Sequence, residues 1–315
     1  MKSIQLTTLI MAALILVCSV AIQPVHAAAT ADDAKEQLAY TVGVQAYLYG
    51  QPIMDLYRTF YEGTLDPRRG HDRTLNEFNP ARKLTTPKDT WVVSPNSDTL
   101  YLRSYLDLTD EPVVLHIPDM GERKFWFPLG NMYHNLLGHL SWDTIGFKGG
   151  DYALCAPGWQ GVMPDGVKRV DMTTPMMWSL GRYAVSGQDD VAAVNKLQDK
   201  TWYVPLSQWK KDMTSAPRAK IDPGRYPVFT KKDMTDPQKY FTTMNEMLRR
   251  NPPLAKDHAL LGWFREINLH PEQQFDWSKL DPATQKGLTR AAADALKIIE
   301  QKEKSFAKRV NGWVE

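Results

Sequence analysis

Residues 100–108 read LYLRSYLDL, and leucine occupies four of the five even positions. This period of two predicts a long strand with one apolar, buried face. The odd positions carry Tyr101, Arg103 and Tyr105, which places a Tyr-Arg-Tyr row on the opposite face.

Further strands are expected on both sides of this segment. Turn residues such as Pro118-Asp119-Met120-Gly121 separate them, and no long helix intervenes. Short strands at this spacing favour an antiparallel sandwich or barrel, and they argue against a doubly wound α/β fold. The other predicted strands are residues 113–117, a strand beginning at 125–129, 151–156 and 176–185.

Helices are expected at both ends of the chain. Residues 30–63 have apolar residues at helical spacing after a capping-box-like start, with a break or kink at Gly50 and Pro52. Residues 64–88 are predicted to form a loop. Asp236-Pro237 and Asp281-Pro282 each offer an N-cap followed by proline at the first helical position.

The expected fold is therefore mainly β with helical additions (α+β). An antiparallel β-sandwich is flanked by N-terminal and C-terminal helices. The expected segments are a signal peptide over 1–27, helices and loop over 28–89, a β-sandwich core over 90–210 and a helical segment over 211–315.

The N-terminus reads as an export signal. Lys2 precedes an uncharged apolar run over residues 6–22, and small residues follow near Ala27, where we expect cleavage. A retained membrane anchor is the alternative, because the run reaches the short limit for a span. Cleavage removes Cys18 and leaves Cys155, which we expect to be a buried thiol. We expect a periplasmic or secreted protein with no membrane span after cleavage.

The overall composition excludes some partners. The formal net charge is only +2, with 23% charged and 43% hydrophobic residues, as in ordinary globular proteins. Such a balance gives no reason to expect nucleic acid as a partner. The chain has 10 Trp, 13 Tyr and 10 Phe, which supply many large rings for a core or a binding surface.

Asp98 is the candidate catalytic residue. Asp98 has the same even parity as Leu100 and Leu102, so these side chains lie on one face of the strand. Arg182 likewise lies on the same face of its strand as Trp178 and Leu180. Because an unpaired buried charge is costly, we expect Asp98 and Arg182 to pair. The pair would frame a pocket, or it would be a structural ion pair that holds two strands together.

The candidate ligand-binding residues are Asn96, Tyr101, Arg103 and Arg182. Asn96 and Asp98 lie in a turn before the strand, where such side chains also form Asx turns. The Tyr-Arg-Tyr row would stack on a ring or bind a carboxylate, or it would be covered by the N-terminal helix.

No cofactor or metal is expected. The chain has no P-loop, no Gly-x-Gly-x-x-Gly fingerprint and no His-Glu-x-x-His motif. His134 and His139 are an odd number of residues apart, so on one regular strand they would face opposite ways.

Several segments in order resemble the bacterial family catalogued as domain of unknown function 1254. The opening stretch 46–59 resembles the first helix of that family. The segments that carry the resemblance are SPNSDTLY (94–101), PVVL (112–115), GDY (150–152), GW (158–159), WSLGR (178–182) and NKLQD (195–199).

This resemblance implies an exported β-sandwich with helical additions. Longer relatives carry a second β domain, domain of unknown function 1214, after a junction like residues 310–313. The chain is thus similar to the first half of that architecture. It would be a stand-alone domain, a shortened gene product, or a protein completed by a second β domain in trans or by a further copy.

Two functions follow from these features. The first is binding of a small molecule or carbohydrate-like ligand in a sandwich pocket near residues 94–101. The second is a periplasmic hydrolase with Asp98 as base and Asn96, Tyr101 or Arg182 orienting the substrate. An incomplete half that needs a second β domain is the third possibility.

Overall fold

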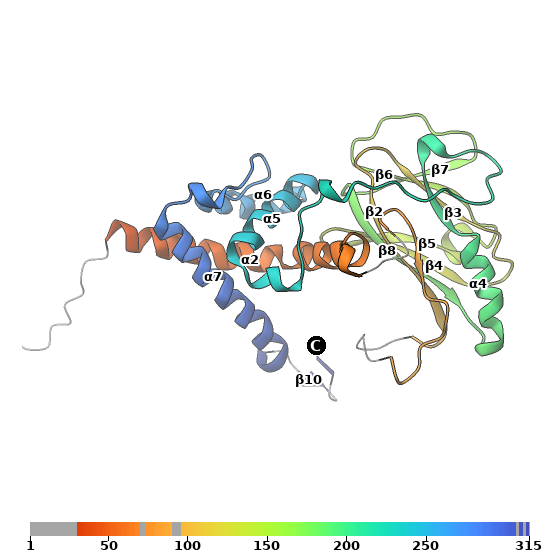
Figure 1. Ribbon diagram of the computed structural model, residues 1–315, viewed down its shortest axis with the longest axis horizontal. Coiled ribbons are helices and arrows are strands. Elements are labelled where there is room, and N and C mark those ends of the chain that lie inside the picture. Colours follow the sequence, from red (N-terminus) through yellow and green to blue (C-terminus); the bar gives the residue numbers. More distant parts are fainter. Residues whose placement is uncertain (1–29, 70–73, 90–95, 307–308, 311–312, 315) are drawn as a thin grey trace, which may run out of the picture.

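The computed structural model describes residues 30–69, 74–89, 96–306, 309–310 and 313–314. The expected signal peptide lies outside these residues. A helical body and a β-sandwich lie side by side along the longest axis of the molecule (Figure 1). The short strands β10 (Arg309–Val310) and β11 (Trp313–Val314) pair near the C-terminus.

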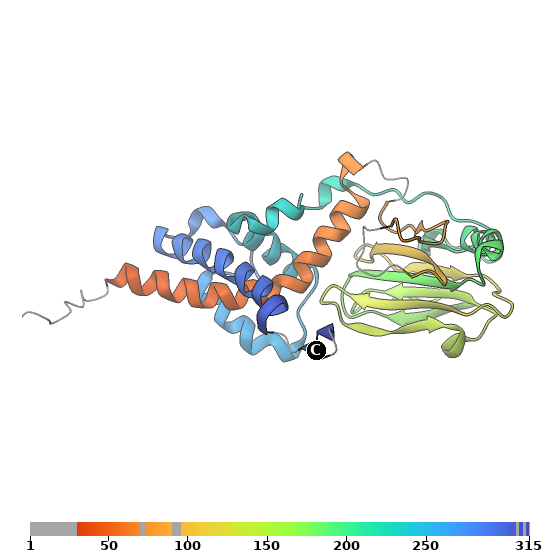
Figure 2. The ribbon, with the colours of Figure 1, turned by 90° about the horizontal axis from the view of Figure 1, so that it is seen from below.

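Helix α2 (Ala31–Thr64) is the longest element. It begins at Thr30, whose hydroxyl accepts a hydrogen bond from the Asp33 N–H, while the Asp33 carboxylate accepts one from the Thr30 N–H. Pro52 lies inside the helix without ending it, and the helix changes direction along its length (Figure 2). The sequence expectation of a break is therefore wrong, and that of a kink is confirmed.

The other helices of the body pack on α2. They are α5 (Pro237–Arg250), α6 (His258–Phe264) and α7 (Pro282–Gln301). Asp236 and Asp281 cap α5 and α7, as their sequence predicts. Buried aromatic rings fill the space between the helices, and Tyr47 stacks on Tyr240 with ring centroids 3.8 Å apart.

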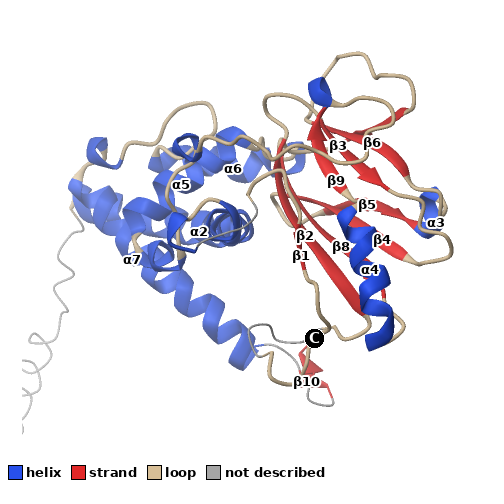
Figure 3. Ribbon diagram, turned by 45° about the vertical axis from the view of Figure 1, so that its right-hand side comes forward, coloured by secondary structure: helices blue, strands red, loops and turns tan. Residues whose placement is uncertain are grey.

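The β-sandwich consists of two sheets stacked face to face (Figure 3). Its short helices are α3 (Trp142–Ile145) and α4 (Val191–Asp199). The five-stranded sheet has the order β1 (Asn79–Pro80), β2 (Thr99–Asp107), β8 (Met176–Ala184), β4 (Phe125–Asn131), β5 (Leu136–Ser141). The four-stranded sheet has the order β7 (Val167–Asp171), β6 (Gly150–Cys155), β3 (Val113–Ile117), β9 (Trp202–Pro205).

The core of the sandwich forms from the inner faces of both sheets. Leu102 and Phe127 from one sheet and Leu115 from the other are fully buried in a single cluster. The expected sandwich is confirmed, with one correction to its antiparallel character. Strands β6 and β7 pair in parallel, because the chain crosses over between Cys155 and Val167 before it rejoins the sheet.

The outer face of the four-stranded sheet is covered by the chain's own loops. Trp202 is buried there beside Cys155, whose thiol is enclosed as expected. Trp159 and Trp209, from the loops after β6 and β9, pack on this face together with Met213. This side of the sandwich is therefore a second, smaller core.

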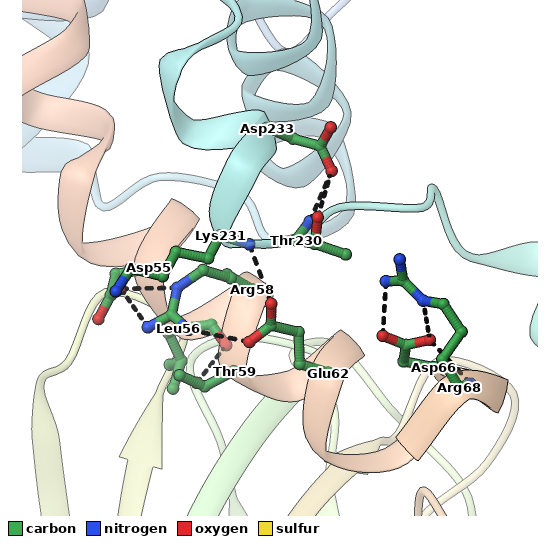
Figure 4. A network of polar contacts seen from close by, with 10 residues as sticks. All are labelled: Asp55, Leu56, Arg58, Thr59, Glu62, Asp66, Arg68, Thr230, Lys231 and Asp233. Carbon is green, nitrogen blue, oxygen red and sulfur yellow. Dashed lines mark hydrogen bonds and ion pairs between the residues drawn. The ribbon is translucent and has the colours of Figure 1, made fainter. Parts of the chain in front are cut away.

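The outer face of the five-stranded sheet meets helix α2 at one end. Phe60 of α2 contacts Tyr105 of β2 edge to face, with centroids 5.8 Å apart. Near this contact, Arg58 is bonded to Asp55 and Glu62, and Glu62 also accepts the Lys231 N–H (Figure 4). These bonds attach the C-terminal half of α2 to the segment at Lys231, which belongs to the helical body.

Candidate functional site

A pocket of about 590 Å³ opens on the outer face of the five-stranded sheet. Its residues come from β8, β4 and β5, from the β4–β5 turn, and from the start of β2 together with the segment that leads into it. The lining residues are Asn96, Asp98, Thr99, Trp126, Pro128, His134, Leu136, His139, Trp178, Leu180 and Arg182.

The strand register sets the order of side chains on the pocket floor. Arg182 of β8 lies between Tyr101 on β2 and Trp126 on β4, which are its direct cross-strand neighbours. At the other end of the floor, Trp178 lies opposite Gly130. A Cβ at Gly130 would come within 2.2 Å of the Trp178 indole, so only glycine lets this ring lie against the strand.

One wall of the pocket is the β4–β5 turn, which carries His134 in a left-handed backbone conformation (φ 59°). The Asn131 side chain fixes this turn, because its Oδ1 accepts the N–H groups of Tyr133 and Asn135, each at 2.9 Å. The Tyr133 hydroxyl donates to the carbonyl of Asn251 at 2.6 Å. The wall is thus attached to the residue that ends α5.

His134 and His139 both line the pocket. The parity argument does not apply to this pair, because His134 lies in the turn between β4 and β5 and the two histidines do not share a strand. Burial lowers the pKa of His134 below its usual range, and the negative charge of Asp55 offsets part of this effect. Near neutral pH His134 is therefore uncharged, and it offers one hydrogen-bond donor and one acceptor.

The expected ion pair between Asp98 and Arg182 does not form. Asp98 is exposed at the rim, and its N–H donates to the Asn96 side chain at 2.8 Å, which is the Asx turn considered as the alternative. Arg182 lies on the outer face of β8, since Met177 and Tyr183 of the opposite parity are the buried ones. It stacks over the Tyr101 ring at 5.2 Å.

The Tyr-Arg-Tyr row is divided between several roles. Helix α2 packs on Tyr105, which confirms for this residue the alternative that the N-terminal helix covers the row. Tyr101 supports Arg182, and Arg103 is exposed with its backbone paired to Asn79 of β1. Neither Tyr101 nor Arg103 lines the pocket, whereas Asn96, Asp98 and Arg182 do.

Sequence reasoning missed the aromatic floor and the histidines of this pocket. Trp126 alternates with the buried Phe125 and Phe127 on β4, so its outward parity was readable from the sequence. Nothing in that alternation shows that Trp126 and Trp178 border one hollow. That depends on the order β8-β4-β5, which brings these strands together.

Two general findings concern the described part of the chain. No three His, Cys, Asp or Glu side chains within it are placed to hold a metal ion. None of its helices is both long and apolar enough to cross a bilayer.

The molecule so described is an α+β protein in which a helical body accompanies a β-sandwich with a surface pocket. Residues 75–205 match the model of the family described as "Protein of unknown function (DUF1254)", which supports for this segment the family that the sequence resembles. The matched segment contains the whole pocket lining, from Asn96 to Arg182.

The crystal structure of the VPA0106 protein from Vibrio parahaemolyticus has a similar fold. The TM-score is 0.62 at 23% sequence identity, and the match covers 86% of this chain. This chain covers 61% of the length of the VPA0106 chain. No curated protein matches the sequence significantly.

Proposed function

We propose that this protein binds a small organic molecule in the pocket on the outer face of the five-stranded sheet. The observation that carries the proposal is the combination of an apolar floor with a few polar groups around it. Trp126, Trp178 and Leu180 form the floor, and His134 and Arg182 supply hydrogen-bonding groups. A volume of about 590 Å³ is in the range of small-molecule sites.

The rim of the pocket contains two residues that the sequence singled out. Asn96 and Asp98 both lie there, so ligand contact near residues 94–101 remains part of this proposal. Tyr101 contributes indirectly by supporting the Arg182 guanidinium.

Binding is better supported than hydrolysis. An Asp98 base would need a neighbour that orients its carboxylate toward a substrate or water. The Asp98 side chain is exposed, and no side chain among the described residues donates a hydrogen bond to its carboxylate. Asn96 bonds the Asp98 backbone instead, which uses its Oδ1 for the turn.

A thermal-shift screen with a pocket-filling variant tests the proposal. The panel contains aromatic carboxylates, the matching amides and monosaccharides. Leu180→Trp places an indole on the pocket floor, and Val162→Trp adds the same group on a loop where Val162 is 90% exposed. We expect at least one panel compound to raise the Tm of the wild type and of Val162→Trp, but not of Leu180→Trp. A panel without effect, or a shift that persists in Leu180→Trp, would refute the proposal.

Export is proposed from the sequence of residues 1–27. We expect the full-length chain, expressed in a Gram-negative host, to be recovered from the periplasm with Ala28 as its first residue. N-terminal sequencing of the fractionated protein measures this. Recovery from the membrane fraction with residues 1–27 intact would support the anchor instead.

Completion by a further subunit is proposed as well. It rests on the resemblance to the first half of a longer architecture. The subunit would be a second β domain from another chain or a second copy of this one. Light scattering of the purified protein separates the second copy from a monomer.

A further inference from the structure

Arg182 differs from the other half-buried arginines of the sandwich and the neighbouring helix. Arg123 forms two bonds with the Asp190 carboxylate, at 2.6 and 2.7 Å, and Arg58 is bonded to both Asp55 and Glu62. No described residue gives the Arg182 guanidinium a carboxylate within 4.0 Å or a hydrogen-bond acceptor.

An unpaired guanidinium that faces a pocket is a site for an anion. Removing its hydration is unfavourable unless an anionic group replaces the water. The planar fork of arginine matches a carboxylate in bidentate geometry. The Tyr101 ring packs against one side of the Arg182 guanidinium. Because this contact already restricts the arginine side chain, less conformational entropy is lost when a ligand binds.

The other charged and titratable groups near the pocket leave this positive charge uncancelled. Asp98 is exposed at the rim, where water and salt screen its charge. Asp55, on the helix beside His134, is already bonded to Arg58. His134 and His139 are both exposed residues, and partial desolvation disfavours the charged form of His134.

The floor beyond Arg182 is lined by apolar side chains. Leu180 and Trp178 follow Arg182 on the same face of β8, and Trp178 is four residues away, or about 13 Å along the strand. A planar ring on this floor would contact Leu180 and the Trp178 indole while its substituent reaches Arg182. A small inorganic anion would leave the apolar end of the pocket unfilled.

We propose that the ligand is an aromatic carboxylate, with its carboxylate bound by Arg182 and its ring on Leu180 and Trp178. This inference rests on the proposed function, whose pocket it uses. Under this inference, Arg182 makes the affinity for the acid higher than the affinity for its neutral analogue.

Calorimetric titration with 2-naphthoate and 2-naphthamide tests the inference, because the two probes share a ring system and differ in charge. We expect the wild type to bind the acid at least tenfold more tightly than the amide. Arg182→Met should remove this preference and leave the amide affinity within twofold. Arg182→Lys should keep a reduced preference, since lysine retains the charge without the fork.

Arg103→Met is the matched control. Arg103 lies on the same face of the neighbouring strand, is exposed and does not line the pocket, so the net charge changes equally. We expect it to bind both probes as the wild type does. Urea denaturation of each variant verifies that the fold persists.

Three results would overturn the inference. Equal binding of acid and amide by the wild type would remove the role of Arg182 and leave the proposed function standing. An acid preference that survives Arg182→Met, or that Arg103→Met also abolishes, would indicate general charge attraction. Failure of both probes to bind would count against the proposed function as well.

Discussion

The two sheets of the sandwich both carry tryptophans on their outer faces, with different results. On the four-stranded sheet, Trp202 is 7% exposed, and Trp159 and Trp209 from long loops pack around it. On the five-stranded sheet, Trp126 and Trp178 remain partly exposed and border a pocket. Loops enclose Trp202, whereas Trp126 and Trp178 keep part of their rings open to the hollow, although Trp178 also packs on the helical core.

The source of the difference is what covers each sheet. The four-stranded sheet is covered by side chains of the segments that follow its own strands β6 and β9. The five-stranded sheet receives helix α2, which reaches Tyr105 at one end of the strands. Trp178, the cross-strand neighbour of Tyr105, also packs on the helical core, and the hollow extends from Trp178 toward Arg182.

Trp202→Ala should have the largest effect on stability. The buried ring stacks on His116 at 4.5 Å, and its loss would open a cavity under the covering loops. We expect a loss of about 3–5 kcal/mol in the free energy of unfolding. Urea denaturation measures it, with Trp202→Phe as a control that keeps most of the volume. A loss below about 1 kcal/mol would show that this face is not a core.

Gly130→Ala should have an intermediate effect. The new methyl group would overlap the Trp178 indole, which must then move or strain the strand. We expect a loss of about 1–3 kcal/mol and a changed near-ultraviolet circular dichroism signal. Gly262→Ala is the control, since nothing lies within 4 Å of its added Cβ. Equal stability of both variants would mean that Trp178 is free to leave the floor.

Trp126→Ala should cost less stability than Trp202→Ala. The Trp126 ring is half-buried on the pocket floor, so its removal leaves a wider hollow that water fills. We expect a loss of about 1 kcal/mol in urea denaturation, together with weaker binding of 2-naphthoate. A loss as large as that of Trp202→Ala would make this face a packing surface and erase the contrast between the sheets.

His134→Asn should have the smallest effect, and only in acid. Because burial lowers the pKa of His134 in the folded state, the unfolded chain binds more protons there as the pH falls. Stability that is present above the unfolded pKa of about 6.5 is then lost toward the lower folded pKa. Asparagine tolerates the left-handed backbone at this position.

The wild type should therefore lose more stability than His134→Asn when urea denaturation is repeated from about pH 7 to about pH 5. Parallel pH profiles of the two proteins would contradict the shift and place His134 in full contact with water.

The sequence predicted the fold where one face of a strand is buried and the other is not. The leucines at 100, 102 and 106 and the run 176–185 show this alternation, and β2 and β8 follow it. Strand β7 was missed because it lies at a sheet edge and exposes Lys168 and Arg169, which leaves little apolar signal. Strand β5 was missed because most of its residues are exposed or half-buried, and strand β9 because it has only 4 residues.

The candidate site was predicted only in part. Asn96, Asp98 and Arg182 do meet at one pocket. Their pairing was wrong, because parity says which residues share a face but not which face is buried. The parity argument places Trp178 and Leu180 inward, whereas the register with β2 and the core cluster put Met177 and Tyr183 inside.

The carbonyl of Asn251 accepts the Tyr133 hydroxyl, and its side-chain oxygen accepts the N–H of Met176 at the start of β8. Asn251 directly follows α5, so one residue of the helical body is bonded both to the pocket wall and to the strand that forms its floor. Any displacement of α5 would therefore be transmitted to the wall and floor together. The end of α5, the pocket wall and the start of β8 are thus joined through a single residue.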